Sequence, residues 1–339
     1  MQQRLKSALG PVAGFICRRL AIGVLTIWAI SVLSFTIIQL PPGDFVSNYV
    51  AQLAQAGGIG TSEDIARLRA DLGLDRPAYI RYAHWAWNVL HGDFGRSLDL
   101  GRPVRDLIAE RLGLTLLVAC GGLCFAWFFA LPIGIYCATH RGSVGDSLFT
   151  VAGLIGTAVP AFLLSLFAMY VAFRYFDVDL GEVHSPRYLD APPSLGKTLD
   201  LVRHLLVPMA ILGVGSLTRL FRILRANLLD EIGKPYVVTA RAKGLRELAL
   251  VLKYPTRIAL NPFVSTIGLV LPQLVSGSLV ISLVMSLPTL GPLLLRALQT
   301  QDMFLAGAIM LVLAALTVIG MLVSDLLLAW LDPRIRLRY

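Results

Sequence analysis

Residues 112–140 have the sequence LGLTLLVACGGLCFAWFFALPIGIYCATH, which contains no Asp, Glu, Lys or Arg. A helix needs about 20 predominantly apolar residues to cross the roughly 30 Å hydrocarbon core of a bilayer. These 29 residues are therefore enough for one membrane span. Five further stretches without the four charged residue types lie on either side of it, at 20–43, 147–173, 204–218, 258–295 and 303–324.

The composition of the whole chain agrees with a membrane protein. Of the 339 residues, 56% are apolar and only 15% are charged, and the mean hydropathy is +0.71. Soluble domains average about 45–50% apolar and about 25% charged residues. Disordered chains have low hydrophobicity. The composition therefore argues against both a soluble enzyme and a disordered chain.

The fourth stretch, 204–218, has only 15 residues and is short for a span. Arg219, Arg222 and Arg225 follow it at intervals of three and form a stripe on one helix face. Long arginine side chains at a helix end can extend to the lipid headgroups. We therefore expect this span to run from Leu205 to Ile223.

The fifth stretch, 258–295, has 38 residues, which is too few for two spans and a turn. Pro288 and Gly291, in the sequence SLPTLGP, interrupt any helix at that point. We expect one span, Pro262–Val284, followed by an apolar loop and a short helix at the membrane face. With one span in each of the other stretches, the chain has six.

The distribution of charge orients these spans. Segments 1–19, 139–146, 219–261 and 331–339 together carry 17 Lys and Arg residues and five acidic residues. Because basic residues accumulate in cytoplasmic loops, these segments and both termini are expected in the cytoplasm. The net charge of +9 is then explained without nucleic-acid binding.

The residues most often used for metal or redox chemistry form no convincing site. Cys120 and Cys124 are four apart on one helix face, with no His or carboxylate near them in sequence, and we expect them to be small buried side chains. His84 and His91 are seven positions apart and have no third metal ligand near them in sequence. Neither a metal site nor a disulfide framework is predicted.

Residues 191–198, APPSLGKT, resemble the end of a phosphate-binding loop. That motif needs Gly at its first position, where this chain has Ala191, and its two prolines lack N–H donors. The sequence therefore predicts no internal ATP site.

Asp325 is the only acidic residue within a predicted span. An intramembrane carboxylate is a functional candidate by default. A polar contact with a basic residue near the interface is the favoured interpretation, and a role in transport chemistry is the alternative.

The basic segment 219–261 is the most informative one. A short helix at Val238–Ala242 is expected to close at Gly244, and a second helix, Leu245–Tyr254, to stop before Pro255. Such a segment is either a generic basic loop near anionic lipid or a short helix presented to a cytoplasmic partner.

Four motifs point to one known family. They are YVVTARAKGL (236–245), RRLAIGVLTIWAISVLSFTIIQLPPGD (18–44), LRADLGLDRPAYIRYAHWAWNVLHGDFGRSL (68–98) and SDLLLAWLDPRIR (324–336). In that order they resemble the coupling loop, the first span, the periplasmic signature and the C-terminal end of the permease subunits of ATP-binding-cassette (ABC) transporters of the dipeptide/oligopeptide type.

This resemblance implies an all-α membrane protein with six transmembrane helices and the type I ABC importer permease fold. In the wider superfamily the coupling loop begins with EAA, where this chain has Val238, Thr239 and Ala240, and continues to a glycine, here Gly244. The implied ATPase-coupling residues are Val238, Thr239, Ala240, Arg241, Ala242, Lys243 and Gly244. Small residues at 240 and 244 would allow close approach, and Arg241 and Lys243 would pair with acids on the partner.

The resemblance also implies the organisation of the chain and its partners. The partners are a second homologous permease, two ABC ATPases that hydrolyse the ATP, a substrate-binding protein and the lipid bilayer of the bacterial inner membrane; no cofactor and no catalytic residue are expected. The expected segments are a cytoplasmic N-terminal segment 1–19, a first transmembrane helix 20–40, a periplasmic helical segment 41–112, a five-helix permease domain 113–330 with a periplasmic segment 174–203 and the coupling loop 224–261, and a cytoplasmic tail 331–339.

Peptides are the substrate that the resemblance favours, and oligosaccharides, opines or nickel remain open. Ser282 stands where the family often has an acidic residue, and segment 174–203 is long. An intramembrane enzyme would need clusters of buried His, Asp or Ser. An ion-driven secondary transporter would need more intramembrane ionisable residues and broken helices.

Overall fold

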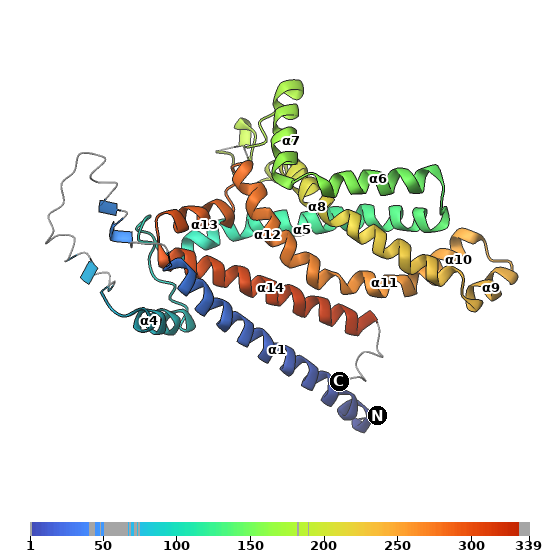
Figure 1. Cartoon of the computed structure of the whole chain (residues 1–339), viewed down its shortest axis with the longest axis horizontal. Helices are drawn as coiled ribbons and strands as arrows, with labels where there is room; N and C mark the ends of the chain where they lie inside the picture. Colours follow the sequence, from blue (N-terminus) through green and yellow to red (C-terminus); the bar gives the residue numbers. More distant parts are fainter. Residues whose placement is uncertain are drawn as a thin grey trace. The chain divides into compact units, whose positions relative to one another are not determined.

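The computed structural model describes residues 2–40, 45–47, 49–50, 67, 69–70, 73, 75–181, 183–188 and 190–331. All of the named elements in these residues are helices, which confirms the predicted all-α fold (Figure 1). Most of the expected tail 331–339, and much of 41–74, lie outside the described residues.

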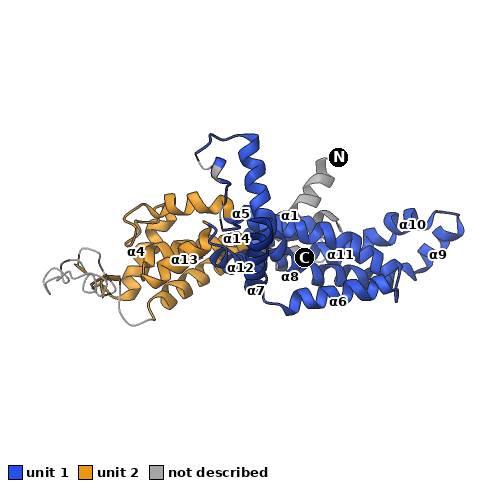
Figure 2. Ribbon diagram, turned by 90° about the horizontal axis from the view of Figure 1, so that it is seen from above, with its two compact units in different colours: residues 1–20, 115–287, 319–339 blue, residues 21–114, 288–318 orange. Residues whose placement is uncertain are grey.

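The helices fall into two compact units (Figure 2). Residues 21–114 and 288–318 form one unit, and residues 1–20, 115–287 and 319–339 form the other. The helices are α1 (Gln2–Ile38), α4 (Ala78–Leu90), α5 (Val104–Thr139), α6 (Val144–Ala158), α7 (Ala161–Phe176), η1 (Pro186–Tyr188), α8 (Leu195–Ile232), α9 (Pro235–Ala242), α10 (Glu247–Lys253), α11 (Pro255–Ser265), α12 (Ile267–Val284), α13 (Leu290–Gln299) and α14 (Met303–Leu331).

In the described part of the chain, four helical segments are long and apolar enough to cross a membrane. They are Cys17–Ile38, Val104–Thr139, Leu195–Ile232 and Met303–Leu327. These four match the first, second, fourth and sixth predicted spans. The short fourth stretch is thus part of a much longer helix, α8, whose 38 residues extend for about 57 Å.

The third predicted span is not one continuous helix. Residues 147–173 belong to two helices, α6 and α7, whose axes differ by 99° (Figure 1). Pro160 lacks an N–H and disfavours the helical conformation of the residue before it. Val159 is accordingly extended, with φ −83° and ψ 124°. The apolar composition continues through this break and gives no sign of it, so the expectation of one span in 147–173 stays a prediction.

The fifth predicted span, Pro262–Val284, is divided between α11 and α12 at Thr266. The short helix expected after it is confirmed as α13. Counting α6 and α7 as one bent span gives five candidate spans among the described residues, so the total of six stays a prediction.

The unit formed by residues 1–20, 115–287 and 319–339 is built around α8, which packs against α6, α7, α11 and α12. Small residues bring α5 and α8 close together: a Cβ on Gly213 would lie 2.8 Å from the carbonyl oxygen of Gly122. Such small residues let membrane helices approach closely enough for dispersion forces to hold them. Cys120 and Cys124 on α5 are exposed on this chain, so their expected burial was wrong.

The unit formed by 21–114 and 288–318 is organised around a buried carboxylate, Asp302. It accepts hydrogen bonds from Ser97 Oγ at 2.6 Å, the Asp99 backbone at 3.2 Å and the Leu305 backbone at 3.1 Å. Arg296 of α13 contacts Asp99 at 2.6 Å. A buried charge with this many donors is well compensated, and it fastens the loop before α5 to the start of α14.

Candidate functional site

After the end of α8, the expected coupling loop 224–261 continues with the short helices α9 and α10. Pro235 begins α9, where its fixed φ suits the first helical turn and its missing N–H leaves no bond unmade. Gly244 ends that turn in the left-handed region with φ +80°. The predicted short helix is confirmed and begins three residues earlier than expected, and the second predicted helix is α10, Glu247–Lys253.

The helix α9 has a buried face and an exposed face. Val237 and Ala240 are buried against the rest of the chain. The exposed residues are Val238, Thr239, Arg241, Ala242, Lys243 and Gly244. Of the seven residues assigned to coupling, six are therefore accessible to a partner, whereas Ala240 packs inward and anchors the helix.

A carboxylate at the end of α8 holds α9 in place. Glu231 is buried, accepts a hydrogen bond from the Tyr236 hydroxyl at 2.5 Å and forms an ion pair with Lys234. Burial, together with the negative charge of Glu231, raises the pKa of Tyr236 to about 12. The phenol therefore stays protonated and donates this bond throughout the physiological pH range.

The acidic partner of Arg241 lies in the same chain. Its Nε donates to Glu247 Oε2 at 3.0 Å and its Nη2 to Glu247 Oε1 at 2.5 Å. This contact lowers the pKa of Glu247 below its ordinary value, so the pair is ionised at neutral pH. The expectation was that Arg241 pairs with acids on a partner. In the structure the pair instead connects α9 to α10 across the turn at Gly244.

A second ion pair fastens α8 close to the loop. Arg225 donates from Nε to Asp146 Oδ1 at 2.8 Å and from Nη2 to Oδ2 at 2.7 Å. The Gly142 backbone N–H donates to the same carboxylate at 3.0 Å. Arg225 was expected to extend to lipid headgroups, but it binds the buried Asp146 at the start of α6. Breaking a buried pair typically costs about 3–5 kcal/mol, so α6 and α8 are firmly joined here.

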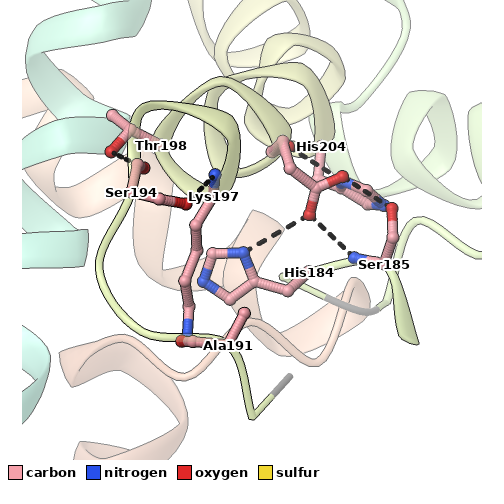
Figure 3. Close-up of polar contacts among 8 residues, drawn as sticks. His184, Ser185, Ala191, Ser194, Lys197, Thr198 and His204 are labelled. Atoms are coloured by element: carbon pink, nitrogen blue, oxygen red, sulfur yellow. Dashed lines mark hydrogen bonds and ion pairs between the residues drawn. The ribbon is translucent and has the colours of Figure 1, made fainter. Parts of the chain in front are cut away.

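The segment that resembles a phosphate-binding loop is closed on itself (Figure 3). Ser194 Oγ accepts a hydrogen bond from the Lys197 backbone at 3.2 Å and caps α8. Lys197 Nζ donates to the carbonyl oxygen of Ala191 at 2.8 Å. Nearby, Asp200 accepts from the Ser185 backbone at 2.8 Å and from Ser185 Oγ at 2.6 Å. These contacts hold the loop in its own shape and do not form a phosphate-binding site.

Asp325 pairs with a basic residue, as the favoured interpretation of the sequence predicted. Its Oδ2 lies 3.2 Å from Arg19 Nη1. The contact joins α14 to α1 within one compact unit.

Comparison with known proteins shows which family of proteins this chain is similar to. Residues 130–337 match the family described as binding-protein-dependent transport system inner membrane component, and residues 12–119 match the N-terminal region of such membrane components. A putative peptide permease protein of Brucella ovis is 36% identical over 319 residues, which cover 94% of this chain and 97% of the relative. The dipeptide transport system permease protein DppB of Escherichia coli is 32% identical over 340 residues, covering 95% and 98%. A putative peptide transport system permease protein of Brucella abortus is 32% identical over 329 residues, covering 96% and 99%.

Proposed function

Because this chain belongs to the family of inner-membrane components of binding-protein-dependent transport systems, we propose that it forms half of the translocation path of a peptide importer. As a family member it is a permease component of an ABC importer and not the catalytic subunit. A second, homologous permease completes the path. Two separate ATPase subunits hydrolyse ATP, and a substrate-binding protein delivers the substrate.

The observation that carries the coupling part of this proposal is the exposed helix α9. Its outward residues, among them Val238, Thr239 and Ala242, are available to a groove on an ATPase. Its inward side is held by Val237, Ala240 and the bond between Tyr236 and Glu231. A helix that is both exposed and rigidly attached can transmit a push from a partner to the helix that carries it.

The contacts of α8 support a path for that push. At one end α8 holds the coupling loop through Glu231, and six residues earlier it holds α6 through Arg225 and Asp146. Movement of α9 is therefore passed to α8 and α6 together. A substrate is coupled to this movement only if it binds one conformation of the path better than the other.

Peptides are proposed as the substrate because several relatives are named peptide or dipeptide permeases. The orientation is proposed from charge, with both termini and the coupling loop in the cytoplasm. In that orientation α9 faces the compartment that contains ATP.

Reconstitution tests this function. The chain is produced with the second permease, the two ATPases and the binding protein of its transport system, and the complex is placed in liposomes. We expect labelled dialanine to accumulate only when ATP and binding protein are both present. ATP hydrolysis by a purified preparation of this chain alone would contradict the proposal, as would dialanine uptake without the ATPases.

A further inference from the structure

Two adjoining cavities lie beside α8, in the unit that contains residues 115–287. The larger has a volume of about 730 Å³ and the smaller about 370 Å³. They share Thr157 and Arg219 as lining residues. Small-molecule sites in proteins typically occupy about 300–1,000 Å³, so the space is adequate for a small peptide.

The larger cavity has hydroxyl groups and positive charges among its lining residues. Its polar lining residues are Thr150, Thr157, Thr218, Arg219, Arg222 and Arg225. No acidic residue is among the described residues that line either cavity. A cavity with this lining attracts anions.

The three arginines differ in whether their charge is balanced. Arg225 is neutralised by Asp146. Among the residues that the structure describes, Arg219 donates to Gln273, an uncharged amide, and pairs with no carboxylate. Arg222 makes no hydrogen bond or ion pair with any residue that the structure describes. Two guanidinium groups therefore remain available for an anion.

These two charges lie well inside α8. Arg219 and Arg222 precede the last residue of the helix, Ile232, by 13 and 10 residues, which is about 20 Å and 15 Å along the helix axis. Apolar residues such as Leu220, Phe221 and Leu224 surround them in sequence and are buried. Both arginines lie at the cytoplasmic end of the predicted span Leu205–Ile223, where charged side chains normally face a bundle interior or water rather than lipid.

The smaller cavity adds an independent indication of a hydrated path. Val159 and Pro160, where the backbone breaks between α6 and α7, line it together with Ser216 and Gln273. Non-helical backbone at membrane depth is tolerated where it is buried in protein or lines a water-filled cavity. Broken helices also form the substrate sites of many transporters.

We propose that Arg219 and Arg222 bind a carboxylate of the transported substrate as it passes these cavities. Within the proposed function, on which this inference rests, that group is the C-terminal carboxylate of the peptide. A planar guanidinium matches a carboxylate with two parallel hydrogen bonds. Arg225 stays bound to Asp146 and does not take part.

The first experiment measures the charge selectivity of the cavity in the assembled transporter, held in lipid nanodiscs. Ala226, an exposed lining residue, is changed to Cys after Cys17, Cys120, Cys124 and Cys137 have been replaced. Its rate of modification is compared between sulfonatoethyl and trimethylammonioethyl methanethiosulfonate, each normalised to a free thiol.

We expect the anionic reagent to react faster, and Arg222→Gln to reduce that preference by about tenfold. The matched control is Arg203→Gln, an exposed residue of the same helix outside both cavities, which should leave the preference unchanged. No reaction at position 226, or a preference that survives Arg222→Gln, would overturn the inference.

The second experiment identifies the anion. Excess dialanine should slow the anionic modification of Ala226→Cys, whereas dialanine amide should not. Protection by inorganic phosphate alone, or equal protection by the acid and the amide, would overturn the carboxylate assignment.

Uptake by reconstituted transporter then connects the site to transport. Dialanine uptake should fall about tenfold or more in Arg222→Gln, retain a substantial part in Arg222→Lys, and stay normal in Arg203→Gln. Normal uptake in Arg222→Gln would overturn the inference. The two modification experiments need no transport, so charge selectivity and protection without any wild-type peptide uptake would contradict only the proposed function.

Discussion

Gly244 is the residue whose conformation is most closely tied to the proposed function. Its φ of +80° lies in the left-handed region, and a Cβ built there meets no atom within 4 Å. A side chain at this position costs about 1 kcal/mol of backbone strain but clashes with nothing in its own chain. Any large loss of function must therefore arise from a partner that approaches the glycine.

We expect Gly244→Glu to abolish peptide uptake and the stimulation of ATP hydrolysis by binding protein, while the amount of the chain in the membrane stays near normal. The added carboxylate stands in the approach to the ATPase. Uptake assays and quantitative immunoblots of membranes measure the two effects.

Gly92→Glu is the matched control, because Gly92 also has a positive φ, of +81°, and open space around its Cβ. Lys197→Ala is a second control and should be almost silent. An equal loss of uptake in the Gly92 and Gly244 variants would mean that strain, and not docking, explains the effect.

At the scale of residues, only part of the pairing could be predicted from the sequence. The sequence could predict that Asp325 has a basic partner, because an acid in an apolar span needs a cation nearby. The pairing of Arg241 with Glu247 spans six positions and depends on the turn at Gly244, so no rule for one helix finds it. Arg225 and Asp146 are 79 positions apart and meet only through packing.

The helices show which features of the fold apolar composition can predict and which it cannot. The long uncharged stretches located α5, α14 and the apolar part of α1 and α8. They did not reveal the 99° bend after α6, although Pro160 marks its position. A proline fixes where a helix stops, but the direction of the next helix depends on its tertiary contacts.

The connection between α9 and α10 gives a prediction at this scale. Arg241→Glu should lower uptake, because it places two carboxylates against each other across the turn. The double variant Arg241→Glu with Glu247→Arg should restore uptake, because it rebuilds the same ion pair in reverse. Uptake of a labelled peptide into liposomes measures both. A double variant no better than the single one would show that Arg241 serves a partner and not its own loop.

The pH dependence of this pair has a definite sign. Arg241 lowers the pKa of Glu247, so the contribution of the pair is present above the ordinary carboxyl pKa and is lost as the pH falls through the lowered value. The pair is thus intact throughout the physiological range, and both uptake measurements can be made at neutral pH.

For the whole molecule, the charge distribution predicts the topology that coupling requires. The segments expected in the cytoplasm carry 17 basic and five acidic residues. The test uses cells that produce this chain without its native cysteines. Asp75→Cys should react with a membrane-impermeant maleimide while the inner membrane is intact, whereas Lys243→Cys should react only after the inner membrane has been disrupted. Labelling of position 75 solely after permeabilisation would refute the topology and the six-span arrangement.

The family, the helical fold and the short helix α9 could all be inferred from the sequence, because motifs such as TARAKGL (239–245) are local. The cavities beside α8 could not. They depend on α6, α8 and α12 meeting around Arg219, and the sequence indicated only that the arginines share one face.

The exposed face of α9 is the surface that we propose docks on an ATPase. The most direct measurement places a benzophenone probe on Thr239→Cys in the assembled, transport-competent complex and identifies the cross-linked protein by mass spectrometry. Thr198→Cys, near the other end of α8, is the control. We expect an adduct with an ATPase subunit from position 239, with a yield that changes on ATP binding, and none from position 198. A complex that transports peptide while position 239 cross-links to lipid alone would contradict this proposal.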